Sequence, residues 1–171
     1  MKSAAHALLA LIGSVERGLA VFLFAAMTII MIADVGLREI RGIGVHGASQ
    51  IAVYCFVALS MIGIGMASAT ASHLRPRFVD RLFPPKYEDF LRRLQEVVMT
   101  GFCLVVASVA TNIVAETHAL GEVSPALRIE IWWIQAVIPL VFYVATIRHA
   151  LYAIFLDLKP VPASALEGET A

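Results

Sequence analysis

Histidine has the widest capacity for metal or haem chemistry of the residue types in this sequence, and it occurs five times, as His6, His46, His73, His118 and His149. A haem held between membrane helices requires histidines within the apolar depth of facing helices. All five lie at or beyond the ends of the long apolar stretches, and none has a second histidine or a cysteine at ligand spacing. The sequence therefore predicts no cofactor and no metal site. A small four-helix membrane haem or redox protein is the alternative.

Two polar pairs have the i, i+4 spacing that places side chains on one face of a helix. We interpret Asp34 and Arg38 as a local ion pair near the end of the first apolar stretch, rather than as a functional intramembrane acid. Asn112 and Glu116 are predicted to form hydrogen bonds between helices. The chain contains no recognisable nucleophile with its base, paired carboxylate site or phosphate-binding loop. It is therefore not expected to be an enzyme.

The elements that must position these residues are membrane-spanning helices. The chain has 171 residues, of which 60% are apolar and 15% charged, whereas soluble domains average about 25% charged residues. Its net charge of zero argues against a nucleic-acid partner. About 20 residues are needed to cross the hydrocarbon core, and four apolar stretches have that length: about 18–37, 51–72, 97–115 and 131–150. Continuous apolar runs are not barrel strands, so the fold class is an all-α integral membrane protein with four transmembrane helices.

The distribution of basic residues predicts the orientation of this four-helix domain, which spans 18–156. The connection between the second and third spans is the most basic one, with Arg75, Arg77, Arg81, Lys86, Arg92 and Arg93. Cytoplasmic loops are enriched in such residues, so this connection and both termini are placed in the cytoplasm. We expect three further segments on the cytoplasmic side: an amphipathic segment at 1–17, another at 86–96 along the inner leaflet, and a flexible tail at 157–171. A solvated loop is the alternative for 86–96.

Further residues are candidates for membrane anchoring and helix packing. Trp132 and Trp133 are expected at the outer interface, and Arg148 at the inner interface, where its side chain can snorkel to the headgroups. A ridge of small residues in the second span favours close packing against a helix of this chain or of a partner: Ser60, Gly63, Ala67 and Ala71. Pro139 is expected to kink the fourth span or to free a backbone carbonyl within it. No span contains the paired glycines or the unwound polar segment that mark the substrate site of a transporter. No intramembrane charge network is expected either. The chain is therefore predicted to be a subunit of a larger assembly.

Three segments, taken in order, resemble the small membrane subunit (the DctQ-like family) of tripartite ATP-independent periplasmic, or TRAP, transporters. Residues 71–84, ASHLRPRFVDRLFP, are similar to that family's His-x-Arg…Asp-x-Leu…Pro stretch. Residues 124–132, SPALRIEIW, resemble its Ser-Pro-Ala-Leu segment, and Ile138-Pro139-Leu140 matches the proline often found in its last span. The resemblance covers roughly 15–156. One departure is Gln50, which stands where the family usually has a carboxylate.

The resemblance implies that the chain works with two other proteins in a bacterial inner membrane. A periplasmic binding protein would capture an organic anion, and a large sodium-coupled permease subunit would move it across the membrane as an elevator. The small subunit would pack against the scaffold of the large one, in contact with membrane lipids, and offer its outer loops to the binding protein. The candidate docking residues are Arg38, Arg41, His46, Glu122 and Arg128. An unrelated membrane assembly factor is a further alternative.

The basic connection generates the first prediction. Each basic residue near an anionic inner leaflet contributes roughly 1 kcal/mol of attraction, so reversing the charge of Arg75, Arg77 and Arg81 together should weaken membrane placement or assembly. Recovery of the transporter complex from membranes measures the effect. Normal recovery and normal transport by the triple variant would contradict the anchoring role.

Overall fold

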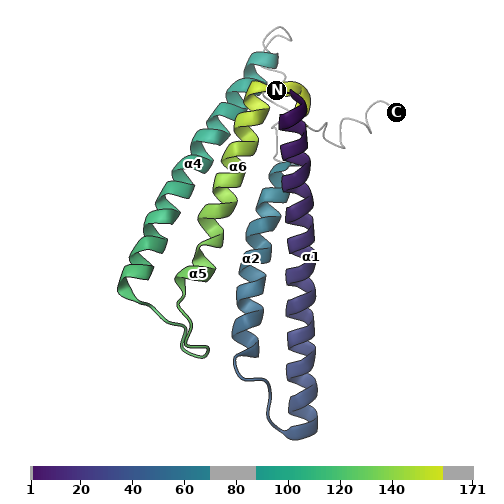
Figure 1. Cartoon of the computed structure of the whole chain (residues 1–171), viewed down its shortest axis with the longest axis vertical. Helices are drawn as coiled ribbons and strands as arrows, with labels where there is room; N and C mark the ends of the chain where they lie inside the picture. Colours follow the sequence, from purple (N-terminus) through teal and green to yellow (C-terminus); the bar gives the residue numbers. More distant parts are fainter. Residues whose placement is uncertain (1, 70–87, 160–171) are drawn as a thin grey trace, which may run out of the picture.

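The computed structural model describes residues 2–69 and 88–159, and nearly all of them are helical (Figure 1). The helices are α1 (Lys2–Arg41), α2 (Ala48–Ala69), α4 (Glu88–Leu120), α5 (Trp132–Gln135) and α6 (Val137–Ile154), followed by a 3₁₀ turn, η2 (Leu156–Leu158). Within these two ranges, four segments are long and apolar enough to cross a membrane: Lys2–Arg41, Ala48–Ala67, Asp89–Leu120 and Trp132–Ile154. The predicted fold class is confirmed. The predictions for Ala71, Arg75, Arg77, Arg81 and the tail from residue 160 lie outside the described residues.

The four long helices stand side by side in a row rather than in a closed square. α4 packs against α6, α6 against α2, and α2 against α1 (Figure 1), so that α1 and α4 form the two edges of the row. Burial follows this order: 33% of the apolar window of Trp132–Ile154 is buried, against 6% of that of α1. We call the end where α1 begins and α6 finishes the terminal end, and the opposite end the loop end. α6 is thus the central helix, and no other described helix packs on the far side of α1 or α4.

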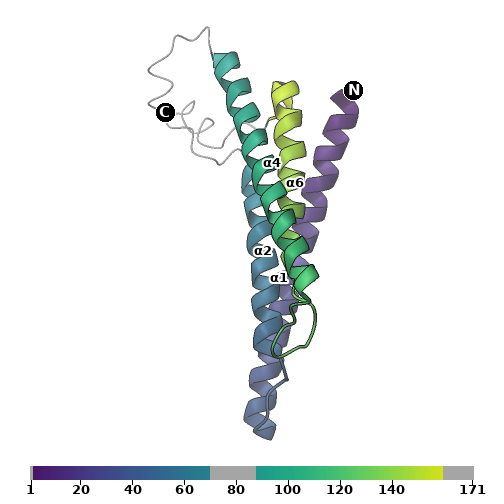
Figure 2. The ribbon, with the colours of Figure 1, turned by 90° about the vertical axis from the view of Figure 1, so that its left-hand side faces the viewer.

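The first helix is unusually long, because nothing in its 40 residues interrupts it. It contains no proline, and it ends where Gly42 adopts a left-handed conformation at φ 73° and its N–H bonds to the carbonyl of Arg38. No break separates residues 2–17 from the first span. A helix of this length measures about 60 Å, roughly twice the hydrocarbon thickness. At the loop end α1 extends well past the last turn of α4 (Figures 1 and 2).

The fourth span is interrupted at Ala136, which separates α5 from α6. Pro139 has no N–H, so the carbonyl of Gln135, four residues earlier, has no helical partner. This is the structural result of the proline that the sequence singles out. The side-chain Oε1 of Gln135 is also buried without a hydrogen-bond partner among the described residues. The ring of Trp132 stacks on that of Trp133, with 4.2 Å between their centroids, and lies tilted against the ring of His118 at a centroid distance of 4.9 Å. Three aromatic rings therefore lie together at the loop end.

Candidate functional site

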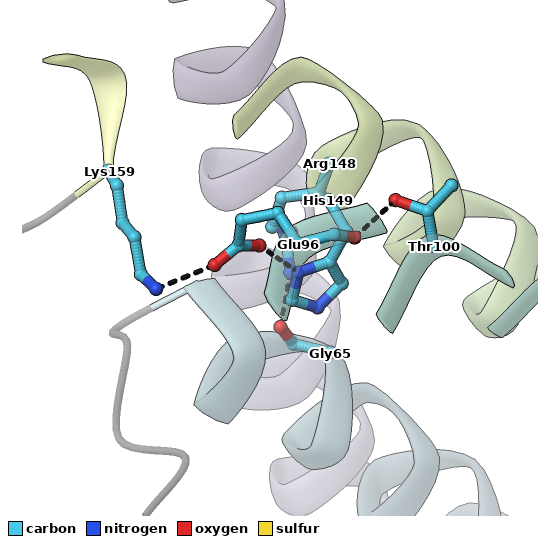
Figure 3. Close-up of polar contacts among 6 residues, drawn as sticks. All are labelled: Gly65, Glu96, Thr100, Arg148, His149 and Lys159. Carbon is cyan, nitrogen blue, oxygen red and sulfur yellow. Dashed lines mark hydrogen bonds and ion pairs between the residues drawn. The ribbon is translucent and has the colours of Figure 1, made fainter. Parts of the chain in front are cut away.

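The two most deeply buried charged residues that the structure describes are Arg148 on α6 and Glu96 on α4 (Figure 3). Arg148 is 1% exposed, and its Nη2 donates a hydrogen bond to Oε2 of Glu16 on α1 at 2.6 Å. Its Nη1 donates to the backbone carbonyl of Gly65 on α2. One side chain therefore joins the central helix to both helices on its α1 side.

Gly65 makes this contact possible because it has no side chain. A Cβ at this position would lie 2.9 Å from Oε1 of Glu16, closer than real Cβ contacts come. Gly65 is itself buried, and a Cβ there would press on the Glu16 carboxylate that Arg148 holds, so a residue without a side chain suits this position. The glycine belongs to the polar joint rather than to the small-residue ridge.

A second buried polar joint lies on the other side of α6. Glu96 of α4 is 1% exposed, its Oε2 lies 2.6 Å from Nδ1 of His149, and its Oε1 accepts a hydrogen bond from Nζ of Lys159 at 2.6 Å (Figure 3). The backbone carbonyl of Glu96 also accepts a bond from the hydroxyl of Thr100. This joint connects α4, α6 and the chain that follows η2. Together with the Arg148 joint it links all four long helices, and we call the two joints the terminal clamp.

The terminal clamp corrects one prediction. The sequence predicts that Arg148 snorkels to the interface, and this prediction is wrong, because its side chain is buried within the protein. Arg148 turns into the protein because an acid on α1 and a carbonyl on α2 satisfy its guanidinium there. The sequence does contain a signal for this arrangement: the predicted orientation places Glu16, Glu96, Arg148 and His149 at the same end of the spans.

The chemistry available at the clamp is ion pairing. Each described charge in it faces an opposite charge or a hydrogen-bond acceptor, and within residues 2–69 and 88–159 no group of three or more His, Cys, Asp or Glu residues is placed to hold a metal ion. Buried ion pairs add little net stability compared with apolar residues of the same size, but loss of one partner is strongly destabilising. The clamp therefore specifies which helices meet and in what register.

The loop end has a smaller joint built on Asp34. This residue is 5% exposed, and its carboxylate accepts hydrogen bonds from Nη2 of Arg38 and from the backbone N–H of Val45, both at 2.7 Å. The predicted ion pair with Arg38 is present. Gly44 lets the loop approach, since a Cβ there would collide with Oδ1 of Asp34. A short acid thus holds the loop after α1 against the end of that helix.

The two loops at the loop end also contact each other. Nε2 of His46 lies 3.0 Å from the carbonyl of Ala126, and the N–H of Ala126 donates to Oε1 of Gln50 at 3.3 Å. Gln50 donates in turn to the hydroxyl of Tyr54. The Leu127 side chain fills the space that a Cβ at Gly47 would need. The amide of Gln50 therefore acts as both acceptor and donor, which a carboxylate cannot do.

The second loop folds back on itself around a buried serine. Ser124 is fully buried, its N–H donates to the carbonyl of Ile129 at 2.8 Å, and its carbonyl accepts from the N–H of Arg128 at 3.0 Å. Arg128 has a φ of 56°, the left-handed region that glycine adopts most easily. A non-glycine residue held there stores roughly 1–3 kcal/mol of strain. The turn thus presents an exposed arginine at an energetic cost.

The structure groups some of the predicted site residues and separates others. The docking candidates are all exposed and lie at the loop end: Arg38, Arg41, His46, Glu122 and Arg128. Of the anchors, Arg92, Arg93 and Trp133 are exposed and Trp132 is half-buried. Of the packing residues, Pro139 is buried, Ser60 and Ala67 are half-buried, and Gly63 has open space where a Cβ would be. The face of α2 at Gly63 is therefore not covered by a described helix.

The Arg148 joint yields a second prediction. Replacing Arg148 with Leu leaves the Glu16 carboxylate without its partner, and we expect the free energy of unfolding to fall by about 3–5 kcal/mol. The double variant Glu16→Leu/Arg148→Leu should recover much of that loss, because both charges are then absent. Thermal unfolding in detergent micelles measures both. A double variant as unstable as the single one would contradict the pairing.

The exposed pair between Lys2 and Asp157 is a matched control for this experiment. Nζ of Lys2 donates to Oδ2 of Asp157 at 2.9 Å, and this hydrogen bond holds the pKa of the Asp157 carboxyl below its usual range. Any stability from this pair is present above the ordinary aspartate pKa and is lost as the pH falls through the depressed value. Because both groups are solvated, Lys2→Ala should leave the unfolding temperature nearly unchanged at neutral pH.

Comparison with known proteins agrees with the membrane fold and with the resemblance in the loops. No curated protein gives a match to the chain. The family model described as the DctQ component of tripartite ATP-independent periplasmic transporters matches residues 27–159. This range includes α2, α4, α5 and α6, the loop-end contacts, and every clamp residue except Glu16. The chain therefore belongs to the DctQ family, the small membrane component of TRAP transporters.

Proposed function

We propose that this chain is the stationary scaffold subunit of a TRAP-type transporter in a bacterial inner membrane. It would hold the large sodium-coupled permease subunit in place and present its loop end to the periplasmic binding protein during uptake of an organic anion. The observation that supports this role best is the distribution of buried polar groups. Those that the structure describes lie towards the two ends of the row: Asp34, Thr117 and Ser124 at the loop end, and Glu96, Arg148 and His149 towards the terminal end.

The middle of the row is apolar. Its buried residues include Ile62, Cys103, Ala107, Val141 and Ala145. A solute that crosses a membrane requires polar groups along its path, and ionisable residues that serve such a path face the interior of the protein. The described interior offers joints at its ends and no chain of polar groups between them. Movement of the solute is therefore assigned to the partner subunit.

The terminal clamp favours a rigid scaffold. In lipid, helices gain little from the hydrophobic effect when they associate, so packing and polar contacts determine their arrangement. Because the clamp joins α1, α2, α4 and α6, a shift of one helix separates a buried charge from its partner. An elevator moves a solute only if the domain against which it slides stays fixed. By opposing such shifts, the terminal clamp would keep this subunit fixed.

The loop end is the proposed docking surface for the binding protein. The contacts among His46, Gln50, Ala126 and Leu127 join its two loops into one body. Arg41 and Arg128 are exposed on it, and the backbone of Arg128 has a positive φ that glycine would adopt without strain. Backbone strain of this kind is typical of functional positions. We assign the two arginines to ionic contacts that speed association.

Charge reversal tests this docking surface. The double variant Arg41→Glu/Arg128→Glu should slow association of the binding protein about tenfold at low salt, because charges at the rim of an interface act mainly on the association rate. Surface plasmon resonance on the complex in nanodiscs measures the rate, and uptake into proteoliposomes should fall in parallel. The matched control is Arg17→Glu, an exposed arginine of α1 far from the loop end. Unchanged association and uptake would show that the loops only connect helices.

Arg128→Gly separates the side chain from the backbone strain. The variant should be as stable as the wild type or more stable, because glycine adopts a positive φ without strain. Association should nevertheless slow, since the guanidinium is lost. Wild-type association by this variant would contradict a docking role for Arg128.

A further inference from the structure

The two edges of the row differ in chemistry. The exposed face of α1 carries large apolar residues within its apolar part, among them Phe22, Ile29 and Ile32. The hydroxyl of Thr28 on this helix donates to the carbonyl of Phe24 at 2.8 Å and so needs no outside partner. This edge matches a lipid environment. The edge formed by α4 carries an amide.

That amide is Asn112, and it points away from the rest of the chain. The buried residues of α4 include Cys103, Ala107 and Thr117. At about 100° per residue, Asn112 lies roughly opposite Cys103 on the helical wheel. Asn112 is exposed, and among the described residues its side chain has no hydrogen-bond partner. Among the described elements α4 packs mainly against α6, with smaller contacts to α5 and η2, and no described residue is hydrogen-bonded to Asn112 on its outward face.

The depth of Asn112 makes this exposure costly in a bilayer. His118, six residues further along α4, contacts Trp132, and tryptophan marks the headgroup level. Asn112 therefore lies about 9 Å deeper, among the exposed apolar residues Val105, Val109 and Ile113. A carboxamide has two donors and an acceptor, and hydrocarbon satisfies none of them.

The neighbouring polar residues do not share this problem. The hydroxyl of Ser108 donates to the carbonyl of Leu104, and that of Thr111 donates to the carbonyl of Ala107, each at 2.8 Å. Glu116 lies one turn closer to the loop end than Asn112, near the level of Trp132, where water and headgroups can solvate it. Asn112 is the residue of this face that requires a partner within the membrane.

We propose that the outward face of α4 is the surface on which the large permease subunit docks, with a transmembrane helix of that subunit supplying a hydrogen-bonding side chain to Asn112. This inference rests on the proposed function. Gly101 lies on the same face with open space around its Cβ position, so a helix can approach the backbone closely there. The partner helix is thus expected to place a polar side chain beside Asn112. It is also expected to pack closely against the backbone of α4 at Gly101, nearer the terminal end of this chain. The α1 edge remains in contact with lipid.

Photo-crosslinking in the assembled transporter tests which edge is covered. A benzophenone amino acid at Val105, on the outward face of α4, should form a crosslink to the large subunit. The same amino acid at Phe22 of α1 should not. A product with the mass of two copies of this chain, or crosslinks to the large subunit from Phe22 alone, would overturn the assignment to α4 while leaving the proposed function intact. Failure of the wild-type chain to co-purify with the large subunit would overturn both.

Substitution of Asn112 tests the hydrogen bond itself. Asn112→Leu should reduce retention of the large subunit on dilution in detergent about three- to tenfold, in line with the modest strength of hydrogen bonds between membrane helices. Asn112→Gln should restore most of the retention, and Ser108→Ala on the same face should have no effect because its hydroxyl bonds within α4. The unfolding temperature of the isolated chain should not fall in any variant. Full retention by Asn112→Leu would overturn the role of the amide.

Discussion

The guanidinium of Arg148 is the contact on which the arrangement of the helices depends most. A charge placed among membrane helices has no water to solvate it, so the protein must supply every partner. Glu16 supplies the opposite charge and Gly65 a carbonyl, and these two residues lie on different helices. The result is a positional constraint that apolar packing alone does not provide. Leucine and valine side chains slide past one another at little cost, whereas a buried ion pair has one satisfactory geometry.

At the loop end, too, polar groups are satisfied by partners within the protein, but most of these groups are neutral. There the connecting segments are short and the partners are mostly neutral: an amide, a histidine ring and backbone groups around Ala126. Only Asp34 contributes a buried charge, and it is matched within one turn of its own helix. The terminal end is therefore joined by charges from distant parts of the chain, and the loop end by local contacts. A partner that displaces one charge at the terminal end therefore affects several helices, whereas one that displaces a contact at the loop end affects mainly the loops.

Sequence patterns predicted the spans well because the length and charge-free character of a membrane helix are local properties. The Asp34–Arg38 pair was predictable for the same reason, since both residues lie on one helix face. Arg148 was misplaced because its partner Glu16 is 132 positions away, and no periodic pattern reports such a contact. The continuity of α1 through residue 17 was missed because a charged pair, Glu16-Arg17, resembles the end of a span. In the structure Glu16 does not end the helix but forms the ion pair with Arg148 in the terminal clamp.

The extra length of α1 shapes the surface at the loop end. In Figure 1 the last turns of α1 project beyond the loop of residues 121–131 and beyond α4 and α5, so the backbone is uneven at this end and α1 is its furthest point. A partner that meets this end first reaches the side of the row formed by α1. To touch the second loop as well, it needs a shape that fits this difference in height, so shape as well as charge determines which proteins can bind.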